Sequence, residues 1–373
     1  MPFLTKLLED DVHKVISPLG YSNAIHGAFL SGCNPQTHGL WTHVYYEPNK
    51  KSSFDFLKYF VWDSLLERIH PLLPVAEKVI IRKYLEKRGQ TIPLLSPSTH
   101  LKKLSIRYTP FVGPNVRFKV PSIFDICRDT RIQFNFVKNS EFGKLKFESS
   151  KIPLNPKFRL NYILLSTDEH FHHLGLSHPK TILHLKEIDM FLSGLFERIQ
   201  RKFSKFTYAI FSDHGLCPVS EKIDFLDFVS KEIDSEDFLI FIDATMARFW
   251  FFSDESKKTV EKTLDNVPFG YTLSSMHRKE YGVDFEDNKF GDIIFLFKPG
   301  LIPSPDSWGM SISRLPLIAV HGYEPHDSSS YGFLTGNLSI SAETIKAIDL
   351  VPTLLDVWSI PIPKHIEGKS LLG

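Results

Sequence analysis

Two short apolar runs separated by one long amphipathic segment constrain the fold of this chain more than any other feature. The runs are YILLS at 162–166 and YAIFS at 208–212. Between them, residues 181–203 repeat apolar side chains every three or four positions, which places these side chains along one face of a helix. A strand, a helix and a strand at this spacing form a βαβ unit, and such units build parallel sheets covered by helices. We therefore predict an α/β fold with a mostly parallel sheet and helices on both faces.

Other segments suggest how the chain is organised around this sheet. Residues 45–120 are rich in Pro, Lys, Tyr and Phe, with a helix expected over 54–69, and we interpret them as an inserted cap segment. Residues 245–310 are strand-rich and are interpreted as a second insertion. The predicted organisation is a single domain over 1–373 that carries both segments. Three further apolar runs predict buried strands at 238–242, 249–252 and 293–297.

Composition limits the classes of partner and compartment. The 44 basic and 43 acidic side chains give a net charge of +1, so charge gives no reason to expect a nucleic-acid or membrane partner. The three cysteines are sparse and unpatterned, which is typical of reduced thiols in the cytoplasm. No apolar run reaches the roughly 18 residues of a membrane helix, and no signal-peptide pattern opens the chain. The sequence indicates no particular oligomeric state.

Acidic and histidine side chains follow three of the apolar runs. Asp168 and His172 come after the first run, Asp213 and His214 after the second, and His321 after a later run at 316–320. In a parallel α/β sheet the carboxyl ends of the strands form the usual site, so these side chains are expected at one edge. Imidazole with carboxylate suits zinc and, in carboxylate-rich sites, manganese. A single Asp-His pair before a glycine is more often a turn with a helix cap, but three such stretches in order favour a metal site.

These stretches resemble motifs of a known family. Asp168, His172 and Gly175 have the spacing Asp-x-x-x-His-x-x-Gly, residues 212–215 read Ser-Asp-His-Gly, and His321 precedes a glycine. The chain thereby resembles the alkaline phosphatase superfamily and, within it, the type I phosphodiesterase/nucleotide pyrophosphatase branch. The closing segment 347–373 is similar to that family's C-terminus.

The resemblance implies a fold and a metal site. The fold would be alkaline-phosphatase-like, and the cofactors would be two divalent cations, with zinc preferred and manganese as the alternative. Asp168, His172 and His321 would hold one cation, and Asp213 and His214 would help to hold the second. The histidines between the matched positions, His170 and His173, are assigned no metal role.

The resemblance also suggests a nucleophile. Residues 31–39, SGCNPQTHG, match the end of a family segment, and an ungapped count back from them places the family's nucleophilic Thr or Ser on Ser22. A hydroxyl at a helix N-terminus, bound to a metal, is a suitable attacking group. The plainer interpretation of Ser22 is an N-cap serine, and Ser31 is the alternative nucleophile. His43 stands where the branch often has an Asn that donates to a phosphoryl oxygen, and it is the second catalytic candidate.

One part of the family pattern is missing. The family begins with a strand that ends in Asp-Gly, and that Asp is a ligand of the second metal. The sequence opens with MPFLTKLLEDDV, which is similar to the segment after that strand, and Asp10 and Asp11 are poor substitutes. We interpret this as a shortened chain, with a single-metal or inactive relative as the other explanation.

The sequence therefore predicts a metal-dependent hydrolase of small-molecule phosphoesters, most specifically a phosphodiesterase or nucleotide pyrophosphatase. A phosphomonoesterase of the same superfamily is one alternative, and a non-catalytic relic that binds a ligand or partner is another. A sulfatase would need an Arg near its nucleophile, and residues 17–40 contain none.

Overall fold

The structure is a computed structural model in which the chain forms two compact units. Unit 1 comprises 1–41, 110–218 and 325–373, and unit 2 comprises 42–109 and 219–324. The interpretation of 45–120 and 245–310 as insertions in a single domain stays a prediction. The described residues are 1–9, 12–50, 52–53, 100, 103–107, 112–138, 148–165, 169–233, 237–265, 267–304 and 316–372. The expected helix over 54–69 lies outside them.

Two general expectations can be compared with these residues. Cys33, Cys127 and Cys217 are free and buried, as the reduced-thiol interpretation requires. Within the described ranges, no helix combines the length and the apolar character that crossing a membrane would require.

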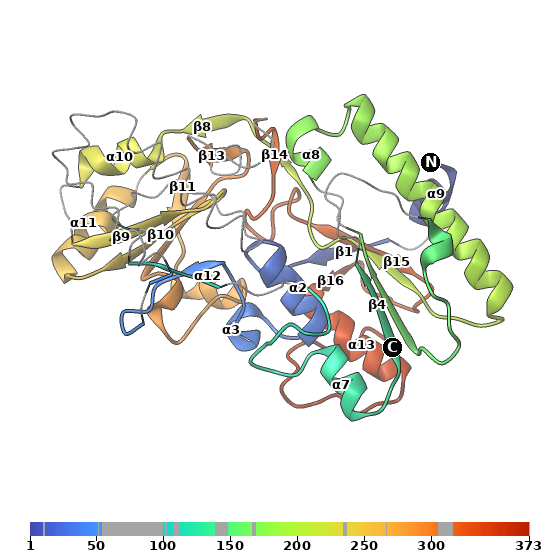
Figure 1. Ribbon diagram of the computed structural model, residues 1–373. Helices are drawn as coiled ribbons and strands as arrows, with labels where there is room; N and C mark the ends of the chain where they lie inside the picture. Colours follow the sequence, from blue (N-terminus) through green and yellow to red (C-terminus); the bar gives the residue numbers. More distant parts are fainter. Residues whose placement is uncertain are drawn as a thin grey trace. The chain divides into compact units, whose positions relative to one another are not determined.

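Unit 1 is built on a four-stranded sheet and a two-stranded sheet (Figure 1). In spatial order the larger sheet contains β16 (Thr344–Lys346), β1 (Val12–Ile16), β15 (Gly332–Gly336) and β6 (Ala209–Phe211). β1 pairs in parallel with β16, whereas β15 pairs antiparallel with both β1 and β6. The smaller sheet is the parallel pair of β4 (Phe134–Lys138) and β5 (Leu160–Leu164). The predicted α/β class is confirmed, and the pairing of the larger sheet is mixed rather than mostly parallel.

The antiparallel strand β15 was not predicted because its short, glycine-bounded sequence resembles a turn. Its sequence is GFLTG, with a glycine at each end. A Cβ on Gly332 would lie 2.4 Å from the carbonyl oxygen of Ser212, and one on Gly336 would lie 2.3 Å from that of Tyr208. Both glycines therefore allow the backbone at the two ends of β6 to approach β15 closely.

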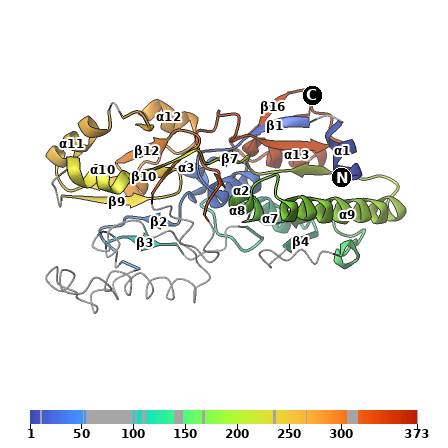
Figure 2. The same ribbon diagram turned by 90° about the horizontal axis from the view of Figure 1, so that it is seen from above.

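Helices cover both faces of the unit 1 strands, as predicted. On one face, alternate residues Val137, Ile163 and Ile210 pack with the long helix α9 (Pro179–Lys202) and the N-terminal helix α1 (Pro2–Glu9). On the other face, Phe136, Tyr162 and Phe211 pack with α7 (Ile123–Asp129) and α13 (Leu350–Val357). The period of two along each strand explains why neighbouring residues serve opposite layers. Figure 2 shows α9 running beside the strands, and α1 contacts the middle of α9, where the N–H of Leu4 donates to Asp189 and Phe3 packs on Phe196.

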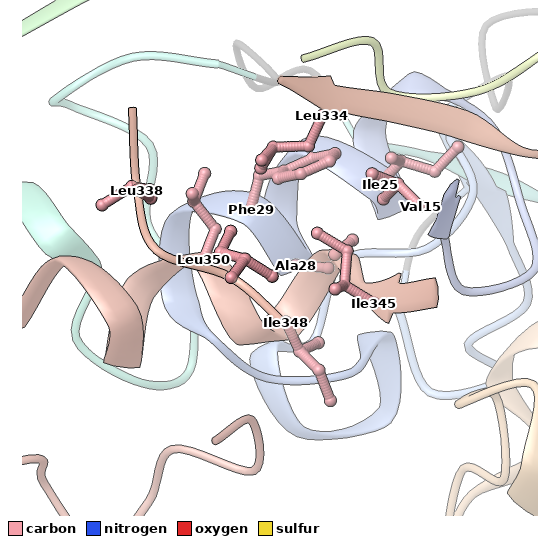
Figure 3. Close-up of a cluster of buried hydrophobic side chains, with 11 residues drawn as sticks. Val15, Ile25, Ala28, Phe29, Leu334, Leu338, Ile345, Ile348 and Leu350 are labelled. Atoms are coloured by element: carbon pink, nitrogen blue, oxygen red, sulfur yellow. The ribbon is translucent and has the colours of Figure 1, made fainter. Parts of the chain in front are cut away.

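The helix α2 (Ser22–Ser31) packs against the four-stranded sheet of unit 1, and this packing fixes the direction of its N-terminus. Ile25, Ala28 and Phe29 form one buried face that contacts β1, β15 and β16 through Val15, Leu334 and Ile345 (Figure 3). The closing segment adds Ile348 and Leu350 to the same cluster. Ser22, at the start of this helix, is therefore held by a helix that is buried along most of its length.

Unit 2 is built on a second sheet, which is antiparallel throughout. In spatial order its strands are β11 (Gly270–Thr272), β12 (Ile293–Phe297), β10 (Met246–Phe251) and β9 (Phe238–Ile242). The three strands predicted from apolar runs at 238–242, 249–252 and 293–297 thus correspond to β9, β10 and β12. The same unit contains α10 (Phe225–Glu232), α11 (Asp254–Leu264), α12 (Ser275–Glu280) and two short pairs, β2 (Val44–Tyr45) with β3 (Ser105–Ile106) and β8 (Glu221–Ile223) with β13 (Leu301–Pro303).

Candidate active site

Ser22 is the first residue of α2, and Tyr21 occupies the cap position before it without a side-chain cap bond. The N-cap interpretation of Ser22 is therefore wrong. Gly20, two residues earlier, has a φ of 138°, and a Cβ there would lie 2.9 Å from both Ala24 and the indole nitrogen of Trp41. The tight entry into α2 requires this glycine, and it leaves Ser22 half-buried at the helix N-terminus, where backbone N–H groups favour an anion.

Ser31, the alternative nucleophile, is engaged at the other end of α2. Its side chain is fully buried, and its hydroxyl donates to the carbonyl oxygen of Gly27 at 2.7 Å and accepts from the backbone N–H of Cys33 at 3.2 Å. Gly32 then ends the helix in the left-handed conformation, with a φ of 68°. These contacts give Ser31 a structural role.

His38, from the matched stretch 31–39, also supports α2. Its Nδ1 accepts from the N–H of Leu40 at 3.2 Å, so its Nε2 donates to the carbonyl oxygen of Ala24 at 3.2 Å. The ring occupies the space beside Gly27, where a Cβ would lie 2.3 Å from it. The Pro-x-x-His-Gly stretch therefore holds the helix that begins with Ser22.

Asp213 and His214 follow β6 after one residue, Ser212, as the sequence predicts. The Nδ1 of His214 donates to the carbonyl oxygen of Gly215 at 2.8 Å, and its Nε2 lies 3.4 Å from Oδ2 of Asp213. The bond at Nδ1 fixes the ring and leaves Nε2 as the nitrogen that can ligate a cation. Two potential ligand atoms, a ring nitrogen and a carboxylate oxygen, thus lie side by side.

Gly215 is needed for close packing. A Cβ there would lie 2.3 Å from the carbonyl oxygen of Ser329 and 2.8 Å from that of Tyr331, and its N–H donates to the carbonyl oxygen of Ser330 at 3.1 Å. The close approach of the 329–331 backbone therefore requires a glycine at this position.

His26 is a candidate site residue that sequence analysis missed. It lies one turn after Ser22 on α2, and its Nε2 is 3.6 Å from Oδ2 of Asp213. Ser17, just before the loop into α2, donates its hydroxyl to the carbonyl oxygen of Asp213 at 2.6 Å. The spacing of four residues from Ser22, which puts both residues on one helix face, was the available signal. Ser17 and His26 together place the start of α2 beside the Asp213–His214 pair.

The first predicted metal motif is only partly described. Asp168 lies outside the described residues. His172 is buried, with 4% of its surface exposed, and belongs to α8 (Glu169–Leu174). Gly175 follows this helix with a φ of 75°, a conformation that favours glycine, so the final glycine of the motif has a backbone role.

Two predicted site residues, His43 and His321, belong to unit 2. His321 follows β14 (Ala319–Val320), is 2% exposed, and precedes Gly322, whose φ is 101°. The hydroxyl of Thr245 donates to the carbonyl oxygen of Gly322 at 2.7 Å and holds this turn to the antiparallel sheet.

The surroundings of His43 keep it neutral. Burial lowers the pKa of its imidazole to about 4, and the charge of Arg248 acts in the same direction. Arg248 is fully buried and donates to Oδ2 of Asp243 at 3.1 Å and to the carbonyl oxygen of Val44 at 2.8 Å. Burial raises the pKa of Asp243, against the influence of Arg248. The imidazole of His43 also has a hydrogen bond with the backbone of Arg107, which acts against the lowering of its pKa.

The described donor set fits a divalent cation in part. Asp213 and His214 offer adjacent oxygen and nitrogen atoms of the kind that zinc and manganese bind. In the part of the chain that the structure describes, no three His, Cys, Asp or Glu side chains form a metal-binding group. The predicted five-residue ligand set, Asp168, His172, Asp213, His214 and His321, therefore stays a prediction.

Comparison with known proteins decides the family. Residues 1–301 match the family described as type I phosphodiesterase/nucleotide pyrophosphatase. The chain belongs to this family. No curated protein sequence matches it.

Solved structures support the fold of this phosphodiesterase-family chain. Human ectonucleotide pyrophosphatase/phosphodiesterase 5 is 14% identical, with a TM-score of 0.66 over 99% of this chain and 92% of that one. The murine protein of the same name is 13% identical, with a TM-score of 0.63 over 97% and 91%. An inactive form of the murine protein, solved in complex with AMP, gives 0.62 at 13% identity over 97% and 91%. At these identities the likeness shows the alkaline-phosphatase-like fold.

Proposed function

We propose that this chain is a metal-dependent hydrolase that cleaves phosphodiester or pyrophosphate bonds in small, nucleotide-like molecules, with Ser22 as the nucleophile. The observation that carries the proposal is the placement of the start of α2 beside Asp213 and His214, through the contacts of Ser17 and His26 with Asp213. The family match supports a phosphodiesterase-type hydrolase, and the AMP bound by a structural relative supports a nucleotide-like substrate.

The proposed reaction begins with attack by Ser22. Its Oγ forms a bond to phosphorus as the bond from phosphorus to the leaving oxygen breaks, and water then releases the phosphoryl or nucleotidyl group from the serine. The N-terminal N–H groups of α2 are oriented to bind the phosphoryl oxygens. The neutral imidazole of His43 donates one N–H to a non-bridging oxygen in this scheme.

Two divalent cations, zinc or manganese, would complete the site. Asp213 and His214 would help to hold one, and Asp168, His172 and His321 would hold the other. When bound, such cations make a serine hydroxyl a stronger nucleophile and offset the negative charge on phosphate. The fixed Nε2 of His214 beside the Asp213 carboxylate is the structural feature that supports this assignment.

A pair of serine variants tests the nucleophile. Ser22→Ala should lower the turnover of an aryl phosphodiester by at least ~10³-fold, because the covalent step then lacks its attacking group. Metal content and melting temperature should not change. The matched variant Ser31→Ala should lower the melting temperature through the contacts of its hydroxyl, and the folded protein should keep its turnover. The opposite pattern would assign the nucleophile to Ser31.

Metal removal tests the reaction class. Chelated protein should be inactive, and zinc or manganese should restore turnover. Phosphodiesters should be hydrolysed faster than monoesters, and the reverse order would make the chain a phosphomonoesterase. Metal binding without hydrolysis of a diester, monoester or pyrophosphate would refute the enzymatic proposal in favour of a ligand-binding relic.

A further inference from the structure

Two histidines that the proposed reaction does not use meet where α8 contacts α9. The ring centroids of His170 on α8 and His184 on α9 are 4.8 Å apart, with the ring planes inclined at 56°. His184 is 5% exposed, and its Nε2 is buried and has no hydrogen-bond partner. His170 is only half-buried, so solvent reaches one side of the pair.

A second buried polar atom lies on the same face of α9. Thr181, one turn before His184, is fully buried, and its hydroxyl also lacks a partner. Two buried polar atoms without hydrogen-bond partners are unfavourable, so this face of α9 is suited to a polar occupant.

The geometry of the pair indicates the nature of that occupant. Two imidazoles that share a tetrahedral zinc, with Zn–N bonds of about 2.0–2.1 Å, have ring centroids about 5 Å apart. The separation of His170 and His184 is close to this value. Oε2 of Glu187 lies 3.8 Å from Nδ1 of His184, on the opposite side of the ring from the buried Nε2. A carboxylate in that position favours the tautomer whose Nε2 can ligate a metal.

We propose that His170 and His184 form an accessory binding site for a late transition-metal ion, zinc in the first place, that links α8 to α9. Among the described side chains no third His, Cys, Asp or Glu completes the group, and the proposal assigns the remaining positions to solvent. The Thr181 hydroxyl is the hydrogen-bond partner of one of these solvent ligands. Because α8 also carries His172, the ion would fix the helix that supplies this predicted ligand of the active site. The accessory site does not depend on the proposed hydrolytic activity.

Metal counting on the full chain tests the site. The chain is dialysed against Zn²⁺, and bound zinc is measured for the wild type, His170→Ala, His184→Leu and a control, His326→Ala, whose side chain is exposed in another part of unit 1. The wild type and the control should each bind one more equivalent of zinc per chain than His170→Ala or His184→Leu. Equal zinc in all four proteins would overturn the proposal and assign an ordered water to the buried atoms.

The same measurement in an Asp213→Ala chain distinguishes this ion from the proposed catalytic ions. In an Asp213→Ala chain, whose proposed catalytic site is impaired, His170→Ala should still remove one equivalent and abolish the zinc-induced rise in melting temperature that this equivalent produces. Cobalt substitution should give absorption bands of imidazole ligation that disappear with His170→Ala. If His170→Ala leaves both the zinc content and the cobalt spectrum of the Asp213→Ala chain unchanged, the accessory site does not exist. Because the half-buried His170 can be replaced without emptying the core, the result does not depend on whether His184→Leu folds.

Discussion

The neutral state of His43 gives a pH dependence that can be calculated. Burial lowers the pKa of this imidazole from 6.5 to about 4. As the pH falls below about 6.5, the unfolded chain takes up a proton that the folded chain does not, so stability is lost between about pH 6.5 and pH 4. At pH 5 the proton-binding factor, 1 + 10^(pKa − pH), is about 30 times larger for the imidazole of the unfolded chain than for that of the folded chain. This ratio corresponds to about 2 kcal/mol of unfolding free energy.

The substitution His43→Asn removes this titration. Urea unfolding at pH 7.5 and pH 5.0, followed by intrinsic fluorescence, gives the loss of unfolding free energy for each protein. The loss should be about 2 kcal/mol smaller for His43→Asn than for the wild type. His326→Asn, at an exposed position, serves as the control and should keep the wild-type difference. An equal loss in all three proteins would show that His43 is not held neutral and would refute the reasoning.

The same measurement can be extended to a second histidine of unit 2, His100. Burial lowers the pKa of His100 to about 4, and the charge of Lys103 adds to this shift. Its Nδ1 accepts from the N–H of Ile240 at 3.0 Å, a bond that requires an unprotonated Nδ1. In the His43→Asn variant, His100 should therefore still cause a loss of unfolding free energy between pH 7.5 and pH 5.0. This loss should have the same sign as the one caused by His43, and a similar size.

Two further outcomes concern stability. Gly215→Ala should lower the unfolding free energy by about 1–3 kcal/mol, because its Cβ would meet backbone oxygen, whereas Gly194→Ala in α9 should be far milder, since the nearest atom is the side-chain hydroxyl of Ser149. Chemical denaturation of both variants checks this, and equal effects would contradict it. Asp243→Ala should cost about 3–5 kcal/mol by leaving the buried guanidinium of Arg248 without its carboxylate. Replacing both residues by apolar ones should recover much of this loss in the same assay, and a double variant as unstable as Asp243→Ala would argue against it.

The sequence by itself determined the elements whose pattern is local. The apolar period of residues 181–203 predicts α9 (Pro179–Lys202), because burial of one helix face needs that repeat. The apolar runs predict β5 and β6 to within two residues. Asp213 and His214 follow β6 as expected, and the family resemblance read from such motifs is confirmed by the match over 1–301.

Tertiary structure decided what depends on residues distant in sequence. The short, glycine-bounded β15 is a strand only because the strands β1 and β6 pair with it, and its antiparallel pairing makes the sheet mixed. Gly215 is needed because the 329–331 backbone lies against it. His26 becomes a site residue only through the approach of Asp213, 187 positions later in the chain, since no local pattern encodes a contact between a helix and a strand end. The neutral state of His43 likewise comes from burial and from Arg248, which only the folded unit brings near it.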